Sequence, residues 1–395
     1  MNQQSEYETG KPRGINSKVT LPQFTFYFLR LGTLGFGGPI ALAARMQKDL
    51  VEELGWISQE DYTEGLAFSQ LSPGPLAAQL AMYLGWVRYG NGGATLTGVC
   101  FILPSFLMVL GIAALYLHYG SLSSIQSIFY GVGAAVVAIL ARSVYKLTRT
   151  TLKADYLLWI LFTLSAIATA WTKSEIIWLF VLCGVVAMIV KTQLRFTAPA
   201  VLPVALTWLT TGIHGPASLN TGFGLFTFFL KAGAFVFGSG LAIVPFLYGG
   251  LVLQSHWLTE RQFLDAVAVA MITPGPVVIT AGFIGYLVAG PLGAALAAVA
   301  VFAPPYLIVL IAAPLYRRFT KNLYVNAFVK GVTAAAVGAI TGAVFILGSR
   351  ALIDRNSLLV ASASLGILLL IKKTPEPVLI LVAGLVGLFL SRGVH

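Results

Sequence analysis

The residue types with the clearest chemical meaning form two Pro-Gly-Pro turns inside long apolar runs. A hydroxyl residue precedes each turn, Ser72 in the first run and Thr273 in the second. Proline suits the first position of a helix, where its missing N–H would have no partner. We therefore expect each turn to begin a half-helix whose unpaired amides and partial positive charge can hold an anion. The turns consist of Pro73, Gly74 and Pro75, and of Pro274, Gly275 and Pro276.

Two more interruptions precede these turns, in the segments GFGGP and FGSG. Inside hydrocarbon, irregular backbone survives only where protein or a polar cavity satisfies its unpaired groups. A single break of this kind is most simply a helix kink. Four breaks in matching pairs favour a binding site instead, with glycines that allow close backbone approach. The additional candidate residues are Gly37, Gly38, Gly238 and Ser239.

Two basic residues, Arg30 and Lys231, lie well inside apolar runs, where a charge is costly and usually functional. Each precedes a glycine of the first break in its run, Gly37 or Gly238, by seven residues, which is two helical turns. We predict that both side chains line the path of the anion. The alternative is that they extend to the membrane interface.

Two acidic residues, Glu64 and Asp265, begin the runs that contain the turns. They are candidates for proton coupling or for balancing the basic pair. The alternative is that they mark helix N-termini, where acidic side chains are common.

The composition excludes a soluble protein. Of 395 residues, 57% are hydrophobic and 10% charged, against about 25% charged in soluble proteins. The net charge of +11 arises from basic residues between apolar runs, as in cytoplasmic membrane loops, so we expect no nucleic-acid partner. Cys and His form no metal-binding cluster, and no phosphate-binding loop occurs. Without paired acids or a metal cluster, an integral-membrane enzyme is disfavoured. We expect a transporter in contact with membrane lipid, without metal or cofactor.

An all-α integral membrane fold follows from the apolar runs, since about 20 mostly apolar residues span a bilayer. The polar residues 1–19 are expected to form a disordered cytoplasmic tail. Thirteen runs are candidate spans. They are 22–44, 64–88, 93–117, 123–141, 156–172, 175–190, 197–213, 222–248, 265–289, 291–315, 329–349, 356–371 and 376–391.

The chain repeats itself at an offset of 201 residues. Trp56 corresponds to Trp257, Pro104 to Pro305, and the first Pro-Gly-Pro turn to the second. Two six-segment repeats joined by one extra segment enter the membrane from opposite sides, because seven is odd. We therefore predict inverted repeats with discontinuous helices. The expected parts are the first repeat at 20–191, a linker with the extra span at 192–221, and the second repeat at 222–391.

The distribution of Lys and Arg tests this topology through the positive-inside rule. With thirteen crossings, seventeen basic residues lie on the side of the N-terminus and six on the other. If the two Pro-Gly-Pro runs were re-entrant hairpins, the same residues would divide ten to thirteen. The rule favours thirteen crossings, a cytoplasmic N-terminus and a periplasmic C-terminus. The six are Arg45, Lys48, Lys173, Arg350, Arg355 and Arg392.

The motifs FLRLGTLGFGGP and LSPGP, then FLKAGAFVFGSG and TPGP, resemble the chromate ion transporter family in its long-chain, two-domain form. The resemblance covers nearly the whole chain after residue 20. It implies efflux of chromate across a bacterial inner membrane, with sulfate as a structural analogue, and assigns the glycines and Pro-Gly-Pro turns to the site. The second half departs from the first at Ser239 and Gly240, where the first has Gly38 and Pro39.

Several alternatives remain open at this point. Chromate and sulfate have the same charge and shape, and a different anion or an organic acid would fit the same pattern. The sequence decides neither the direction of transport nor the coupling ion. A homo-oligomer is compatible with it.

Overall fold

The computed structural model describes residues 19–36, 38–119, 122–172, 177–192, 221–236, 243–319, 322–352, 354–371 and 375–392. These ranges contain helices and connecting turns and no β-strand. The predicted all-α fold is confirmed. Residues 1–18 of the expected tail, the extra span 197–213, and the candidates Gly37, Gly238 and Ser239 lie outside the described residues.

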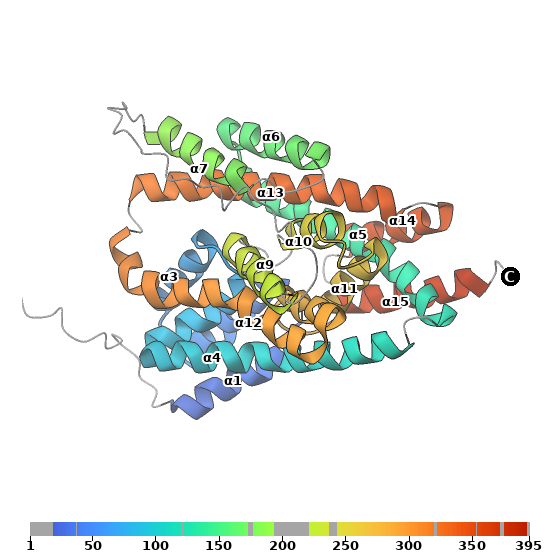
Figure 1. Cartoon of the computed structure of the whole chain (residues 1–395). Coiled ribbons are helices and arrows are strands. Elements are labelled where there is room, and N and C mark those ends of the chain that lie inside the picture. Colours follow the sequence, from blue (N-terminus) through green and yellow to red (C-terminus); the bar gives the residue numbers. More distant parts are fainter. Residues whose placement is uncertain are drawn as a thin grey trace, which may run out of the picture.

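Two sets of helices follow each other in the same order (Figure 1). The first set is α1 (Leu21–Leu34), α2 (Gly38–Met46), η1 (Gln47–Glu53), α3 (Gln59–Leu71), α4 (Leu76–Tyr119), α5 (Ser123–Leu152), α6 (Tyr156–Thr172) and α7 (Ile177–Thr192). The second set is α9 (Thr221–Phe235), α10 (Ile243–Tyr248), η3 (Gly249–Gln254), α11 (Glu260–Ile272), η4 (Val277–Ile279), α12 (Thr280–Phe319), α13 (Leu323–Ala351), α14 (Arg355–Leu370) and α15 (Glu376–Arg392).

Four helical stretches among the described residues are long and apolar enough to cross a membrane. Shorter apolar helices surround them, including α6, α14 and α15. The chain is therefore a multi-pass membrane protein. The four stretches are Leu76–Tyr119, Ile125–Leu152, Val277–Tyr316 and Leu323–Ser349.

Helices α4 and α12 each reverse direction near one end. In α4 the backbone leaves helical geometry at Tyr89 and Gly90, where Gly90 has φ of 64°. Gly85 and Gly93 then pack directly against each other across the reversal. In α12 the same change occurs at Ala289 and Gly290. Each helix therefore has a short arm and a long arm, which are 76–88 and 91–119 in α4, and 280–288 and 291–319 in α12.

Helix α3 and the short arm of α4 fold back on each other as a hairpin. The rings of Phe68 and Tyr83 lie 5.4 Å apart, and a Cβ on Gly65 would clash with Tyr83. Gly65 and Tyr83 each lie eight residues from the nearest proline of the turn, so a straight path would separate them widely. An arm of 13 residues reaches about 20 Å, less than the roughly 30 Å hydrocarbon core. The run 64–88 therefore has the re-entrant geometry, and the expectation that it crosses as one span is corrected.

The helices that flank the first break of each half also pack against each other. Tyr27 of α1 donates a hydrogen bond to Asp49 of η1 at 3.1 Å. In the second half, Phe228 of α9 stacks on Phe246 of α10 at 5.1 Å. Helices α11 and α12 also pack together beside the second turn. The helices on either side of each break thus fold back on each other.

The last two helices of each half pack against the other half. Helix α13 contacts α6 and α7, whereas α5 contacts α14 and α15 (Figure 1). Ser165 of α6 donates to the carbonyl of Ala335 in α13 at 2.7 Å, and Gly131 of α5 lies directly against Ala383 of α15. The two halves are interlocked, so neither predicted repeat forms a compact body alone.

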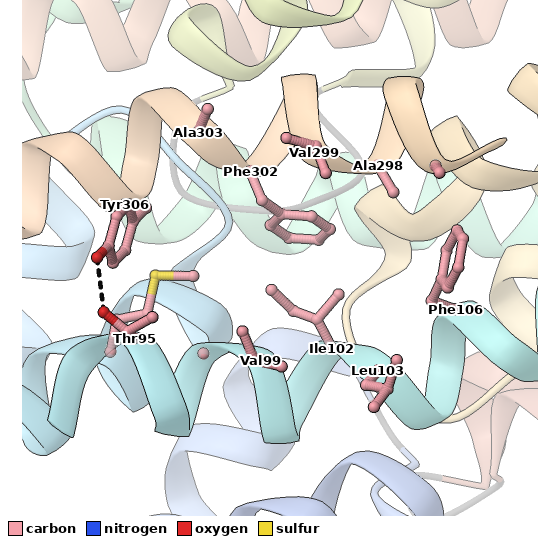
Figure 2. Close-up of a pocket in the computed structure, with 13 residues that line it drawn as sticks. Thr95, Val99, Ile102, Leu103, Phe106, Ala298, Val299, Phe302, Ala303 and Tyr306 are labelled. Atoms are coloured by element: carbon pink, nitrogen blue, oxygen red, sulfur yellow. Dashed lines mark hydrogen bonds between the residues drawn. The ribbon is translucent and has the colours of Figure 1, made fainter. Parts of the chain in front are cut away.

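The long arms of α4 and α12 run antiparallel to each other. Thr95 hydrogen-bonds to Tyr306 at 2.6 Å, and an apolar crevice of about 410 Å³ extends from this pair to Phe106 (Figure 2). Corresponding helices that run antiparallel are related by a two-fold axis across them, which is the arrangement that inverted repeats require. Residues that line the crevice fall into pairs 200 positions apart, such as Val99 with Val299.

The offset between halves therefore changes from 201 to 200 after the second turn. Gly90 corresponds to Gly290, so Pro104 corresponds to Pro304 rather than to Pro305. The second half is therefore one residue shorter than the first at this point. The difference coincides with η4, a 3₁₀ turn that has no counterpart in the first half. A 3₁₀ turn rises about 2.0 Å per residue against 1.5 Å in an α-helix, so three residues cover the length of four.

Candidate anion site at the meeting of the two halves

The two Pro-Gly-Pro turns each bind the first break of the other half. The amide of Gly74 donates to the carbonyl of Val236, and the amide of Gly275 donates to the carbonyl of Gly35 at 3.0 Å. Donors and acceptors both correspond at an offset of 201. Such an exchange of partners is the signature of a two-fold interface. Each turn therefore lies against the other half at Gly35 or Val236.

Glycine is required in both turns by backbone geometry and by space. Gly74 has φ of 142° and Gly275 has φ of 95°, a range that side chains with a Cβ rarely adopt. A Cβ on Gly74 would lie 2.6 Å from Cβ of Pro305, and one on Gly275 would overlap Oγ of Ser105. Each turn thus rests on the long arm of the other half.

The half-helix that begins after Pro75 starts in the protein interior. Leu76, Ala77 and Ala78 are all buried, and their amides have no acceptor within the ranges that the structure describes. The amides of Val277 and Val278, after the second turn, likewise have no acceptor among the described residues. Buried donors without an acceptor are rare in proteins. Such donors occur here at the starts of two helices, and helix starts of this kind can bind an anion.

The hydroxyl groups beside the turns bond to their own helices. Ser72 Oγ donates to the carbonyl of Phe68 at 2.8 Å, and Thr273 Oγ1 donates to that of Ala270 at 3.2 Å. In this conformation neither hydroxyl proton is directed to a ligand. Gly38 begins α2 with φ of 75° and open space around it.

Gln79 is a site residue that sequence reasoning missed. Its side chain is fully buried, and its Nε2 donates to the carbonyl of Pro73 at 2.7 Å. In the second half, Thr280 lies the same number of residues after its turn and donates to the carbonyl of Val277 at 2.7 Å. A polar residue four positions after the last proline of each turn was the available signal.

The basic pair lies apart from these buried contacts. Arg30 is exposed on a face of α1 that also carries Phe26 and Leu34, which are 65% and 51% exposed. The opposite face of α1 packs through Gly32 against the backbone of Phe101. Lys231 is half-buried. The predicted role of these two side chains in the path of the anion stays a prediction.

Each acidic candidate meets a tyrosine of the other half. Asp265 is 4% exposed and accepts a hydrogen bond from Tyr116 at 2.7 Å. Glu64 is half-buried and interacts electrostatically with Tyr316. The two tyrosines correspond at the offset of 200. This second reciprocal contact was not visible in the sequence, because it pairs residues from different halves.

These features define a multi-pass helical membrane protein with interrupted helices. The chain belongs to the chromate transporter family, whose model matches it twice, over residues 22–188 and 223–388. The resemblance in the sequence motifs is thereby confirmed.

Curated relatives match nearly the whole chain. The chromate transport protein of Cupriavidus metallidurans is 53% identical over 93% of each chain. A probable chromate transport protein of Synechococcus elongatus is 49% identical over 94% of this chain and 96% of its own. The chromate transport protein of Pseudomonas aeruginosa is 32% identical over 82% and 80%. No solved structure matches the chain.

Proposed function

We propose that this protein exports chromate, and that the dianion binds between the starts of the two half-helices. The names of its relatives support the substrate. The observation that carries the site is the pair of buried helix starts, at Leu76–Ala78 and Val277–Val278, whose amides have no acceptor among the described residues. A doubly charged tetrahedral oxyanion has enough acceptor oxygens to bond both sets.

Binding of the anion would compete with the contacts between the halves. The amides of Gly74 and Gly275 now donate to carbonyl oxygens of the opposite half. A charged oxygen is a stronger acceptor than a carbonyl, so a dianion can replace either carbonyl. Loss of one contact would loosen one turn from its partner break. This competition would link occupancy of the site to a movement of the halves, as alternating access requires.

The hairpins also support the proposed orientation in the inner membrane. If all four hairpins are re-entrant and 197–213 crosses, five of the 25 Lys and Arg residues lie on one side. Arg30 and Lys231 lie within hairpins, and the other eighteen lie on the opposite side. The positive-inside rule then places the N-terminus in the cytoplasm and the C-terminus in the periplasm. The five are Lys173, Arg261, Arg350, Arg355 and Arg392.

The membrane potential would favour export of a dianion from a cell that is negative inside. Its contribution is about 2.3 kcal/mol per charge for each 100 mV, and twice that for two charges. We propose that Arg30 and Lys231 attract the anion along the approach to the site rather than bind it there. Arg30 is exposed, as an approach residue would need to be.

Everted membrane vesicles test the proposal, because export from the cell becomes uptake into the vesicle. Vesicles with the protein should accumulate chromate, and sulfate should compete because its charge and shape are the same. Vesicles with Gly275→Ala serve as the control. Uptake that no oxyanion competes with, or uptake of an organic acid alone, would contradict the proposed substrate.

A further inference from the structure

The contact between Asp265 and Tyr116 joins the two halves at one end of the molecule. Asp265 is the sixth residue of helix α11, and Tyr116 lies near the end of the long arm of α4. The phenol donates to Asp265 Oδ2 at 2.7 Å, and its ring packs edge-on against Phe129 and Phe283. The carboxyl group is thus bonded to a tyrosine that is itself packed among aromatic rings, and Asp265 is 4% exposed.

Few charges among the described residues face this carboxyl group. Arg261, one turn earlier on α11, interacts with it electrostatically, but its guanidinium is exposed and donates to the carbonyl of Gln126 at 2.9 Å. On another face of α11, Tyr248 donates to Glu260 at 3.2 Å.

The charged groups of the neighbouring helices are engaged with one another. Glu376 at the start of α15 interacts with Arg142 and Lys146 of α5. His118, two residues after Tyr116, packs edge-on against Tyr119.

A carboxylate in this environment is less stable than a carboxylate in water. Burial removes water from the charged form, and a neutral phenol replaces only part of that solvation. Separation of the halves would withdraw Tyr116 and admit water, which favours the carboxylate. The charge of Asp265 therefore depends on whether this end of the molecule is closed.

At the opposite end of the molecule lies the corresponding acid–tyrosine pair, in which the acid is less buried. Glu64 of α3 interacts with Tyr316 at the end of the long arm of α12, whose ring packs edge-on against Phe68 at 5.1 Å. Glu64 is half-buried, whereas Asp265 is buried. Because the long arms are antiparallel, the two pairs lie at opposite ends, and inverted repeats exchange such states during transport.

We propose that Asp265 is a proton-binding residue of the transport cycle. It holds a proton while the Tyr116 contact is closed and releases it when the halves separate, so anion movement is coupled to proton movement. Tyr116 is a positioning residue that keeps the acid enclosed. This inference rests on the proposed transport function and adds a coupling ion to it.

Purified protein in liposomes loaded with a pH-sensitive dye tests the coupling. An imposed chromate gradient should produce a proton flux with wild type. Asp265→Asn should retain chromate flux while its proton flux falls at least tenfold, and Asp265→Glu should restore the proton flux. Glu260→Gln is the matched control, since Glu260 lies on the same helix and also accepts a hydrogen bond from a tyrosine. In this variant proton flux should remain coupled to chromate flux. Tyr116→Phe should shift the pH profile of transport.

Infrared difference spectroscopy gives an independent readout that requires no transport. On titration from neutral to acidic pH, wild type should show the carbonyl stretch of a protonated carboxylic acid at a higher pH than a solvent-exposed aspartate would, and Asp265→Glu should shift that band. Chromate flux without proton flux in wild type, or a coupled Asp265→Asn protein, would overturn the inference. Absence of chromate flux in wild type would instead refute the transport function itself.

Discussion

The two Pro-Gly-Pro turns share one backbone arrangement but differ in the side chains that support it. Each turn has a glycine with positive φ whose amide bonds to a carbonyl of the other half. In the first half, the long side chain of Gln79 bonds to a carbonyl of the turn itself. In the second half, the short side chain of Thr280 bonds to the carbonyl of Val277, just after the turn. Backbone groups are therefore common to both turns, and we infer that the ligand is held mainly by amides. The side chains set how easily each turn moves.

The largest effect is expected from a Cβ at the turn glycines. Gly275→Ala and Gly74→Ala should abolish chromate uptake, because each forces a disfavoured φ and overlaps the opposite half. The control is Gly111→Ala, which adds a methyl group where nothing lies within 4 Å. Vesicle uptake assays at matched protein levels measure the loss. Full activity in either turn variant would reduce the turns to kinks.

The basic pair compares an exposed with a half-buried position. Lys231→Ala and Arg30→Ala should each lower chromate uptake at least tenfold, since an approach path without its cation no longer attracts a dianion. The loss should be smaller at high ionic strength for the exposed Arg30. Uptake measured at low and high salt decides this, and normal uptake in both variants would remove them from the path.

The supports of the two turns should differ in their contribution to stability. Gln79→Ala leaves the carbonyl of Pro73 without its donor and opens a cavity, so a loss of about 2–4 kcal/mol is expected. Thr280→Ala removes a local bond only, with an expected loss of about 1 kcal/mol. Thermal unfolding in detergent measures both. Equal losses would mean that the side-chain difference between the halves has no mechanical consequence.

Tyr306→Phe makes the two ends of the central crevice alike. It removes the bond to Thr95 and leaves a phenylalanine, as Phe106 is at the other end (Figure 2). The expected cost is about 0.5–1.5 kcal/mol, with chromate uptake retained. A loss of uptake with unchanged thermal stability would instead assign the bond to the transport cycle.

The smallest effect concerns two aspartates that precede α6 and α14. Hydrogen bonds from Ser357 and Tyr130 hold the pKa of Asp354 below its usual value. For Asp155, burial acts to raise the pKa, but the hydrogen bond and charge of Lys191 outweigh it, so that pKa is also lowered. A lowered folded-state pKa stabilises the protein above the unfolded value, and this contribution is lost as pH falls through the folded pKa.

Stability should therefore decline on acidification below about pH 4. Asp354→Asn should flatten this decline in unfolding curves measured between neutral and acidic pH. A decline of unchanged steepness in that variant would assign the acid sensitivity to other groups.

The breaks and the repeat could be predicted from the sequence, because proline and glycine spacing records them directly. The hairpins could not, since an apolar run such as 64–88 has the same length and composition whether it crosses or folds back. With only two hairpins, the Lys and Arg residues divide almost evenly between the two sides of the membrane. With four hairpins, most of them lie on one side. Tyr116 was missed because its partner Asp265 lies in the other half. Gln79 was missed although its partner Pro73 is local, because its position after the turn was not weighed.

A structure determined with bound chromate tests the central claim most directly. The anion should lie within hydrogen-bonding distance of amides at Leu76–Ala78 and Val277–Val278, with at least one bond from Gly74 or Gly275 to the opposite half broken. An anion bound away from both helix starts, or both inter-half bonds intact beside a bound anion, would contradict the account.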